Sequence, residues 1–260
     1  MDRMSYDSIV VTTSEHRLTV TLNRLMRQNA LTDTMLAELH EALDLAEHSP
    51  SCRMIVLQGA NGVFCTGMDL DEAAKDVQVA GDSPPRGAQF FSLLRRFTAI
   101  PRVVVSKVDG RVSGGGVGLV AASDFVFASE RSQFSLPEAL WGLLPCSVAP
   151  FLQRRIGFQG SYSMTLSTLP LNARKAERLG LVDEVAEDPG LPIQRLASRV
   201  TKLEATTIAA AKRYFARLWP ITEEMEAAAL RELDNLLSSA SVQHAIAGFA
   251  SRDRSFPWER

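Results

Sequence analysis

One glutamate stands in a stretch of the chain that carries very little charge. Between residues 112 and 153 only four of 42 residues are charged, and Glu138 follows Pro137 within that stretch. Burial raises the pKa of a carboxyl group and prepares it for proton transfer near neutral pH. Glu138 is therefore a candidate general acid or base. The alternative is a glutamate in the first turn of a helix, where it stabilises the helix dipole without doing chemistry.

Two glycine-rich segments follow predicted strands and precede predicted helices. One is Gly114-Gly115-Gly116, before the apolar segment 117–122, and the other is the segment 62–71, GVFCTGMDLD. Glycine lets a ligand approach the backbone, and the start of a helix leaves N–H groups without partners. Two such turns on neighbouring strands could each direct one N–H at a single oxygen, as in an oxyanion hole. The glycine triplet could equally be a tight packing turn.

The sequence lacks the motifs that are typical of metal binding, nucleotide binding and catalysis by histidine. The glycine triplet lacks dinucleotide-binding spacing, and the segment 62–67 is followed by Met68-Asp69 where a phosphate loop needs Lys-Ser/Thr. The cysteines have no CxxC spacing, and the histidines form no ligand pair. His40 and His48 are expected on the solvated side of a helix. No metal or nucleotide cofactor is therefore expected.

The composition is that of an ordinary globular protein. Of 260 residues 46% are apolar and 22% are charged, and the net charge is −2. This composition excludes disordered, collagen-like and coiled-coil proteins. The small net charge predicts no strong electrostatic attraction to nucleic acid or to an anionic membrane. No apolar run approaches the roughly 20 residues of a membrane span, and Met1-Asp2-Arg3 leads into no apolar signal core. A cytoplasmic protein is expected.

Alternating strands and helices must position these candidates. Apolar runs predict strands over 8–13 and 18–22, which form a hairpin, and over 54–58, 102–108, 124–128 and, more weakly, 181–185. A stripe of Leu36, Leu39, Leu43 and Ala46 predicts a helix over 33–47, with Thr32 as N-cap. Repeated β-β-α order places the chain in the α/β class. The segment 76–87 is expected to be a surface loop.

After Leu191 the pattern is almost purely helical. The segment 222–238 has apolar residues at helical spacing. Such a helical third beside an α/β body often packs as a cap or as a contact between subunits. The chain is therefore divided into a core over 1–190 and a helical region over 191–260.

Four ordered motifs across residues 8–185 resemble those of the enoyl-CoA hydratase/isomerase (crotonase) family. They are Asn23-Arg24 with Asn29-Ala30-Leu31, then Phe64–Leu70, then Asp109-Gly110 with Gly114–Gly116 and Asp124, and finally Pro137-Glu138 with Gly142-Leu143 and Pro145. The resemblance implies a crotonase-type spiral of β-β-α units with its active site in the core. It also implies that the C-terminal helices form a trimerisation region, so a homotrimer or a dimer of trimers is expected.

The resemblance also implies roles for individual residues. The N–H groups of Met68 and Gly115 would form an oxyanion hole for a thioester carbonyl, and Glu138 would be a catalytic carboxylate. Four further residues would border the substrate, namely Gly67, Leu70, Gly114 and Trp141. The second glutamate of the hydratases falls at Gly118 here. A hydratase that positions water with two carboxylates would therefore lack one of them.

Other differences from the hydratases indicate a particular subgroup of this family. Segments 64–70 and 135–159 resemble the dehydratases of polyketide β-branching cassettes, and Cys146-Ser147-Val148-Ala149 replaces the glycines usual in hydratases. The resemblance implies dehydration of a 3-hydroxy-3-methylglutaryl thioester on an acyl carrier protein to a 3-methylglutaconyl thioester. The phosphopantetheine arm of the carrier protein, or of coenzyme A, would carry the substrate, with no other cofactor.

Several alternatives stay open. The chain could be an enoyl-CoA isomerase or hydratase that uses Glu138 alone, or a non-catalytic crotonase homologue. If Glu138 is not the base, Asp69 and Cys146 are the other candidates. The cation that would hold a distal substrate carboxylate could be any of Lys75, Arg86, Arg95, Arg96 and Arg111.

Overall fold

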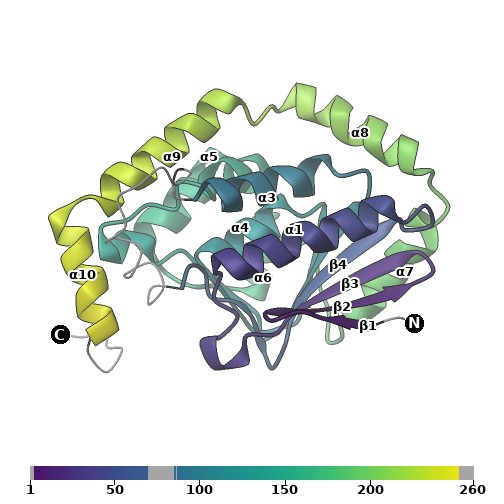
Figure 1. Cartoon of the computed structure of the whole chain (residues 1–260), viewed down its shortest axis with the longest axis horizontal. Helices are drawn as coiled ribbons and strands as arrows, with labels where there is room; N and C mark the ends of the chain where they lie inside the picture. The colour runs from purple at the N-terminus through teal and green to yellow at the C-terminus, as the bar shows by residue number, and fades with distance from the viewer. Residues whose placement is uncertain (1–2, 70–84, 86, 252–260) are drawn as a thin grey trace.

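Two β-sheets form the frame of the molecule. The computed structural model describes residues 3–69, 85 and 87–251, with side chains up to Ile246 (Figure 1). In this described part, one sheet has seven strands in the order β1-β2-β3-β4-β6-β8-β11. The first three strands are antiparallel, and β3 onward are parallel. Their bounds are β1 Arg3–Ser5, β2 Ile9–Ser14, β3 Arg17–Leu22, β4 Met54–Gly59, β6 Val103–Val108, β8 Phe125–Ala128 and β11 Glu184–Val185.

In the second, smaller sheet the strands β5, β7 and β9 are neighbours in the same sequence as β4, β6 and β8 of the large sheet. Its described strands are ordered β10-β9-β7-β5, with β5, β7 and β9 parallel. Each of β4, β6 and β8 is followed along the chain by one of these short strands and then by a helix, so the predicted β-β-α repeat is confirmed. The bounds are β5 Val63–Cys65, β7 Arg111–Ser113, β9 Gln133–Ser135 and β10 Leu171–Asn172.

A glycine makes the corner between the two sheets at the end of β6. Gly110 has φ +96°, and a Cβ atom placed on it would lie 1.7 Å from Gly62 O. Only glycine fits where two backbones approach this closely and φ is positive. This explains Asp109-Gly110 in the third motif, because the chain must turn there from the large sheet into the small one.

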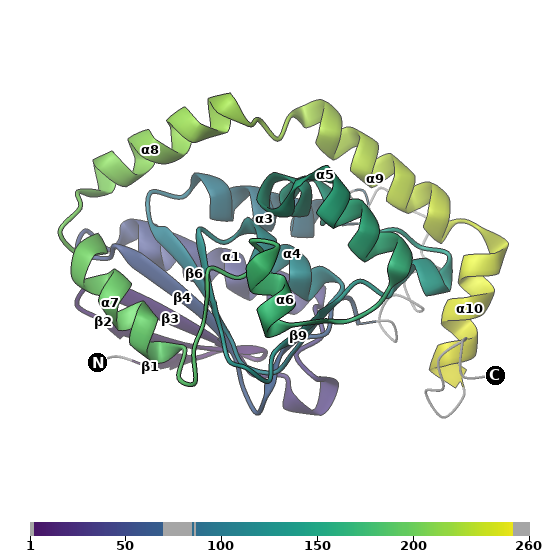
Figure 2. The ribbon, with the colours of Figure 1, turned by 180° about the vertical axis from the view of Figure 1, so that it is seen from behind.

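Helices cover both faces of the large sheet, as Figure 2 shows from behind. Val104 points into the main core, whereas Val103 and Val105 pack on the opposite face against α7. Burial on both faces is usual for parallel strands and explains the continuous Val run of β6. The helices of the body are α1 Asp33–His48, α3 Ala88–Ala99, α4 Gly115–Ala122, α5 Ala149–Ser167, α6 Ala173–Arg178 and α7 Gly190–Val200.

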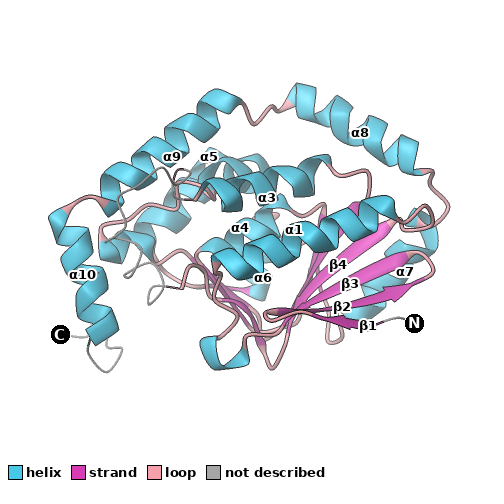
Figure 3. Cartoon of the chain, in the orientation of Figure 1, coloured by secondary structure: helices cyan, strands magenta, loops and turns pink. Residues whose placement is uncertain are grey.

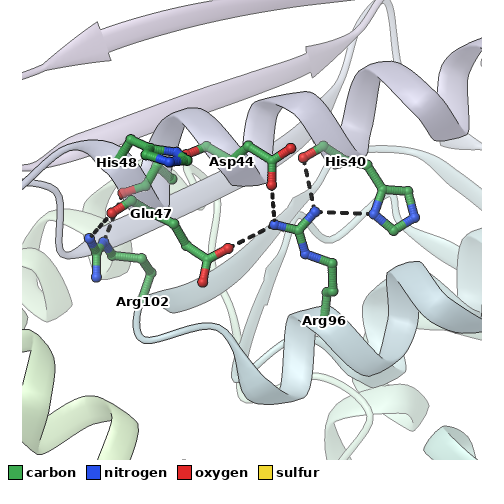
Figure 4. A network of polar contacts seen from close by, with 7 residues as sticks. His40, Asp44, Glu47, His48, Arg96 and Arg102 are labelled. Carbon is green, nitrogen blue, oxygen red and sulfur yellow. Dashed lines mark hydrogen bonds and ion pairs between the residues drawn. The ribbon is translucent and has the colours of Figure 1, made fainter.

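Helix α1 has the predicted cap and the predicted apolar stripe. Thr32 Oγ1 accepts a hydrogen bond from Met35 N–H, and the four residues of the stripe are buried. His48 is exposed as expected, but the expectation for His40 was wrong. His40 is half-buried, because Arg96 on the neighbouring α3 contacts both its ring and its carbonyl oxygen (Figure 4). The apolar period alone does not show which polar residues face a second helix.

The last three helices form an arc around the body (Figure 3). They are α8 Ala205–Leu218, α9 Glu223–Leu237 and α10 Ala240–Ser251. The predicted helix over 222–238 is confirmed, with Thr222 as its N-cap. The strand predicted over 181–185 is shorter than expected, since only Glu184 and Val185 pair with β8. No described helix is both long and apolar enough to cross a membrane.

Two arginines near α1 allow a direct comparison of buried and surface contacts (Figure 4). Arg102 is 4% exposed and donates to the carbonyl oxygens of Ala46, Glu47 and Ser49 at the end of α1. These carbonyls have no partner within the helix. We expect Arg102→Met to lower the free energy of unfolding by about 3 kcal/mol, because a charged donor is lost and the carbonyl oxygens of Ala46 and Glu47 are left unpaired. Ser49 O keeps its hydrogen bond from Cys52 N–H.

Arg96→Met is the matched control for this substitution. Arg96 pairs with the carboxylates of Asp44 and Glu47 on the partly exposed side of α1. Because its carboxylate partners can be solvated once Arg96 is removed, the loss should be smaller than that of Arg102→Met, at about 1 kcal/mol, including the contact with His40. Urea unfolding at fixed protein concentration measures both variants. Equal losses would contradict this interpretation of Arg102.

Candidate active site

A cavity of about 570 Å³ lies between the small sheet and the C-terminal helices. Its described walls come from the loop after β5, the N-termini of α1 and α3, the turn between β7 and α4, the 3₁₀ turn Glu138–Trp141, the turn before α5, and α9. Most wall residues are apolar, and Leu233 and Leu237 of α9 are among them. The helical third of the chain therefore contributes directly to the cavity.

The backbone amides of Met68 and Gly115 lie on this wall. Met68 forms a parallel bridge with Leu31: Leu31 N–H donates to Gly67 O, and Asp69 N–H donates to Leu31 O. In such a bridge the N–H of the middle residue points away from the partner strand. Gly115 is the first residue of α4, where an N–H has no partner within the helix.

The two turns touch each other through their backbones. A Cβ atom placed on Gly67, which has φ +87°, would lie 3.0 Å from the backbone nitrogen of Gly115. The pairing of β5 with β7 brings them together, as their positions on neighbouring strands predict. The two turns therefore place the backbone of Met68 and the start of α4 next to each other at the cavity wall.

Glu138 begins the 3₁₀ turn that follows β9, with Pro137 before it. Its Oε1 would lie 3.3 Å from a Cβ placed on Gly114, so the carboxyl group is next to the glycine triplet. Its Oε2 is buried and has no hydrogen-bond partner among the described residues. Burial raises the pKa of Glu138 from 4.5 to about 7, since its environment provides little compensation for the charge. A group with this pKa can exchange a proton at neutral pH.

Apolar side chains fill the space beside Gly118. A Cβ atom on Gly118 would lie 3.0 Å from both Phe90 Cζ and Val148 Cγ2, and 3.2 Å from Leu94 Cδ1. The second carboxylate expected of a hydratase is therefore absent from this position, and the site around it is packed with hydrocarbon.

The remaining predicted site residues fall into three groups. Gly67, Gly114 and Trp141 line the cavity, and Trp141 also packs against Val242 and Ile246 of α10. Leu70 lies outside the described residues. Cys146 lines the cavity, but burial raises the pKa of its thiol to about 11, so it stays protonated at neutral pH and is not available as a base. Asp69 lines the cavity too, but is ion-paired with Arg24 at 3.1 Å.

The candidate cations for a distal carboxylate are not placed at the described walls. Lys75 and Arg86 lie outside the described residues. The others are engaged elsewhere: Arg95 with Glu226 of α9, Arg96 with α1, and Arg111 with Gln28. The assignment of Arg95, Arg96 and Arg111 as substrate cations is not supported, because each lies outside the described cavity wall and has another partner.

Sequence reasoning missed several wall residues. The buried Ser147 lines the cavity, but the sequence pointed to it only as part of the segment that replaces the hydratase glycines. Phe90 and Leu233 line the cavity too, although no motif marks them. Their approach depends on the packing of α3 and α9, which no local spacing reveals. Among the described residues, no group of three or more His, Cys, Asp and Glu side chains is placed to hold a metal ion.

A spiral of β-β-α units that brings two glycine turns and the unpartnered carboxyl group of Glu138 to one cavity is the arrangement of a crotonase-fold protein. The chain belongs to the enoyl-CoA hydratase/isomerase family, whose model matches residues 13–260.

Individual relatives support this assignment over the full chain. It is 30% identical over 259 residues to the bacillaene synthase dehydratase PksH of Bacillus subtilis, covering 100% of this chain and 99% of that protein. The crystal structure of the B. subtilis polyketide biosynthesis protein pksH, described as an enoyl-CoA hydratase, superposes with a TM-score of 0.91, 30% identity and coverage of 97% and 100%. The 1,2-epoxyphenylacetyl-CoA isomerase of Escherichia coli is 32% identical over 67% of this chain and 68% of its own length.

The raised pKa of Glu138 has a consequence for stability. Between pH 4.5 and about 7 the folded protein holds a proton on Glu138 that the unfolded chain has released. The free energy of unfolding therefore falls as pH rises through this window. We expect Glu138→Gln to remove this fall. The free energy of unfolding of the variant, relative to that of the wild type, should therefore rise by on the order of 3 kcal/mol from pH 5 to pH 8. Denaturant unfolding at several pH values measures it.

The exposed Glu41→Gln is the control for the pH series, and it should leave the fall in the free energy of unfolding that Glu138 causes in place. If Glu138→Gln also left this fall in place, the carboxyl group would not be buried as described.

Packing at Gly118 predicts that the missing glutamate cannot be restored. Gly118→Glu would push a carboxylate against Phe90 and Val148. We expect a loss of about 2–4 kcal/mol in the free energy of unfolding, from overpacking and from burying an unpaired charge. Gly118→Ala adds only the Cβ atom and should lose less. A Gly118→Glu variant as stable as the wild type would show that this space accepts a carboxylate.

Proposed function

We propose that this protein removes water from a 3-hydroxy-3-methylglutaryl group carried on an acyl carrier protein, giving the 3-methylglutaconyl thioester. The observation that carries the proposal is the buried carboxyl group of Glu138, whose Oε2 has no partner among the described residues, beside the backbone of Met68 and Gly115. Hydrocarbon is packed around Gly118, the position of the second hydratase carboxylate. The full-length similarity to a protein named as a dehydratase of the bacillaene synthase supports the direction of the reaction.

The reaction begins with loss of the C2 proton. The thioester carbonyl oxygen accepts hydrogen bonds from Met68 N–H and Gly115 N–H, which stabilise the negative charge of the enolate. The carboxylate of Glu138 takes the proton as the C2–H bond breaks. Removing one such donor typically costs about 2.7–4 kcal/mol of transition-state stabilisation.

The same carboxyl group then completes the elimination. Protonated Glu138 gives its proton to the hydroxyl group on C3, the C3–O bond breaks, a C2=C3 double bond forms and one water molecule leaves. Glu138 returns to the carboxylate form, so one group serves as base and acid. The C3 carbon of this substrate is tertiary and loses hydroxide more readily than a secondary carbon. Less acid assistance is then needed, which is consistent with glycine at position 118.

The phosphopantetheine arm of the carrier protein delivers the substrate in this proposal, with no metal or nucleotide taking part. We also propose a homotrimer or a dimer of trimers. Large apolar side chains that are exposed in the single chain support this assembly, because apolar side chains gathered on a protein surface usually mark a contact with a partner. They lie on α5, α8 and the segment after α8, and include Tyr162, Leu166, Tyr214, Phe215 and Trp219.

An enoyl-CoA isomerase or hydratase is the second candidate function. Isomerisation needs one proton shuttle, which Glu138 alone could provide, and the similarity to the E. coli isomerase favours it. A non-catalytic homologue is disfavoured, because burying Glu138 without a partner is unfavourable for stability and has no use in a scaffold. The substrate separates the two catalytic proposals: a branched 3-hydroxy diacid or a linear 3-enoyl thioester.

Mass spectrometry of the carrier-bound acyl group tests the proposed reaction. Incubation of 3-hydroxy-3-methylglutaryl carrier protein with the wild type should produce loss of one water, and Glu138→Gln should lose at least about 10²–10⁴-fold in turnover. Because the reaction needs the carboxylate, the rate should rise with pH up to about 7 and then level off.

Glu130→Gln is the control in the same region of the chain, because Glu130 is exposed and paired with Arg174. It should keep the wild-type turnover. Near wild-type dehydration by Glu138→Gln would refute the assignment of the base, and conversion of a linear 3-enoyl-CoA alone would favour the isomerase.

A further inference from the structure

A second buried oxygen in the cavity has no partner. Within the described residues, two buried side-chain polar atoms lack a hydrogen bond: Glu138 Oε2 and Ser147 Oγ. Ser147 is 6% exposed and lines the same cavity as Glu138. Leaving a buried hydroxyl group unpaired is unfavourable, and native proteins rarely do so without a functional reason.

The surrounding backbone holds Ser147 in place. Ser147 lies in the turn that enters α5, where Val148 N–H and Ala149 N–H both donate to Pro145 O. On its other side is Gly87, with φ +79°, and a Cβ atom there would lie 3.3 Å from Ser147 Oγ and 2.8 Å from Leu233 Cδ2. A side chain at position 87 would therefore crowd both the hydroxyl group and the α9 wall.

The hydroxyl group lies among apolar walls. Val148, Phe90 and Leu233 line the cavity with it, and no lysine or arginine is among the described wall residues. Glu138 and the amides of Met68 and Gly115 are assigned above to the C2 proton and the thioester carbonyl. Ser147 Oγ is then a polar group left for the rest of the acyl chain. A hydrocarbon acyl group would leave it unpaired, whereas an oxygenated one would not.

We propose that Ser147 Oγ donates a hydrogen bond to an oxygen of the acyl group beyond the thioester carbonyl, and so selects acyl thioesters that carry a hydroxyl or carboxylate over hydrocarbon ones. Sites built to bind a substrate oxygen discriminate strongly against analogues that lack it, because the site's own polar group is then left unpaired. This inference deepens the proposed function and rests on it for the placing of the thioester.

Binding of three pantetheine thioesters tests the proposal. The 3-hydroxy-3-methylglutaryl thioester carries both oxygen groups, the 3-hydroxy-3-methylbutyryl thioester lacks the carboxylate, and the 3-methylbutyryl thioester lacks both. Dissociation constants are measured by calorimetry in Glu138→Gln protein, which prevents turnover, with and without Ser147→Ala. Ser147→Ala should weaken the first ligand and leave the third unchanged or slightly tighter.

The second ligand identifies the oxygen. If Ser147 binds the C3 hydroxyl, Ser147→Ala should weaken both oxygenated ligands by about 3- to 10-fold. If it binds the distal carboxylate, only the first should weaken, by about 10- to 100-fold, because hydrogen bonds to charged groups are stronger. Equal weakening of all three ligands, or no change for the first, would overturn the proposal.

Two further variants separate binding from structure. Ser147→Cys keeps the size but has a weaker donor, so it should resemble Ser147→Ala. Ser161→Ala removes an equally buried hydroxyl on α5 outside the cavity wall and should change no ligand's affinity.

The outcome is also distinguishable from failure of the proposed function. Wild-type protein that fails to dehydrate the first thioester, while Ser147→Ala still weakens it selectively, would remove the dehydratase proposal and keep this one. Normal dehydration by the wild type, with no selective weakening of the first thioester by Ser147→Ala, would keep the dehydratase proposal and remove the proposal for Ser147.

Discussion

The close backbone contact between two strand-to-helix turns is the constraint on which the site depends. Gly67 and Gly115 approach so closely that a Cβ atom on Gly67 would lie 3.0 Å from the other residue's nitrogen. Parallel pairing of β5 and β7 sets this approach, and the glycine corner at Gly110 lets the chain leave the large sheet to form β7. A side chain at either turn would separate the amides of Met68 and Gly115.

Two buried carboxyl groups at the cavity, Glu138 and Asp69, have different electrostatic environments. Glu138 has no ion pair and no hydrogen bond to Oε2 among the described residues, so burial leaves its pKa near neutrality. By contrast Asp69 is paired with Arg24, although it borders the same cavity. The space of a second carboxylate is filled by Phe90, Leu94 and Val148. Glu138 is thus a described wall carboxyl group whose pKa lies near neutrality.

The C-terminal helices belong to the site as well as to the surface. Leu233 and Leu237 of α9 form part of the cavity wall, and α10 packs on Trp141 beside Glu138. Lys212 of α8 joins the arc to the body, with its Nζ 2.7 Å from Asp124 Oδ2. A division at residue 190 therefore separates regions of different secondary structure, while the cavity is built from both sides of it.

The sequence by itself determined the α/β class, the long strands of the large sheet, helices α1 and α9, and the prominence of Glu138 and the two glycine turns. These follow from local rules, since apolar periodicity and glycine positions depend on neighbours in the chain. Only the tertiary structure decided that His40 is covered by Arg96, that Arg95 and Arg96 are engaged away from the cavity, and that Ser147 is buried without a partner. Each of these depends on which residue from a distant segment packs against it, and packing between segments leaves no period in the sequence.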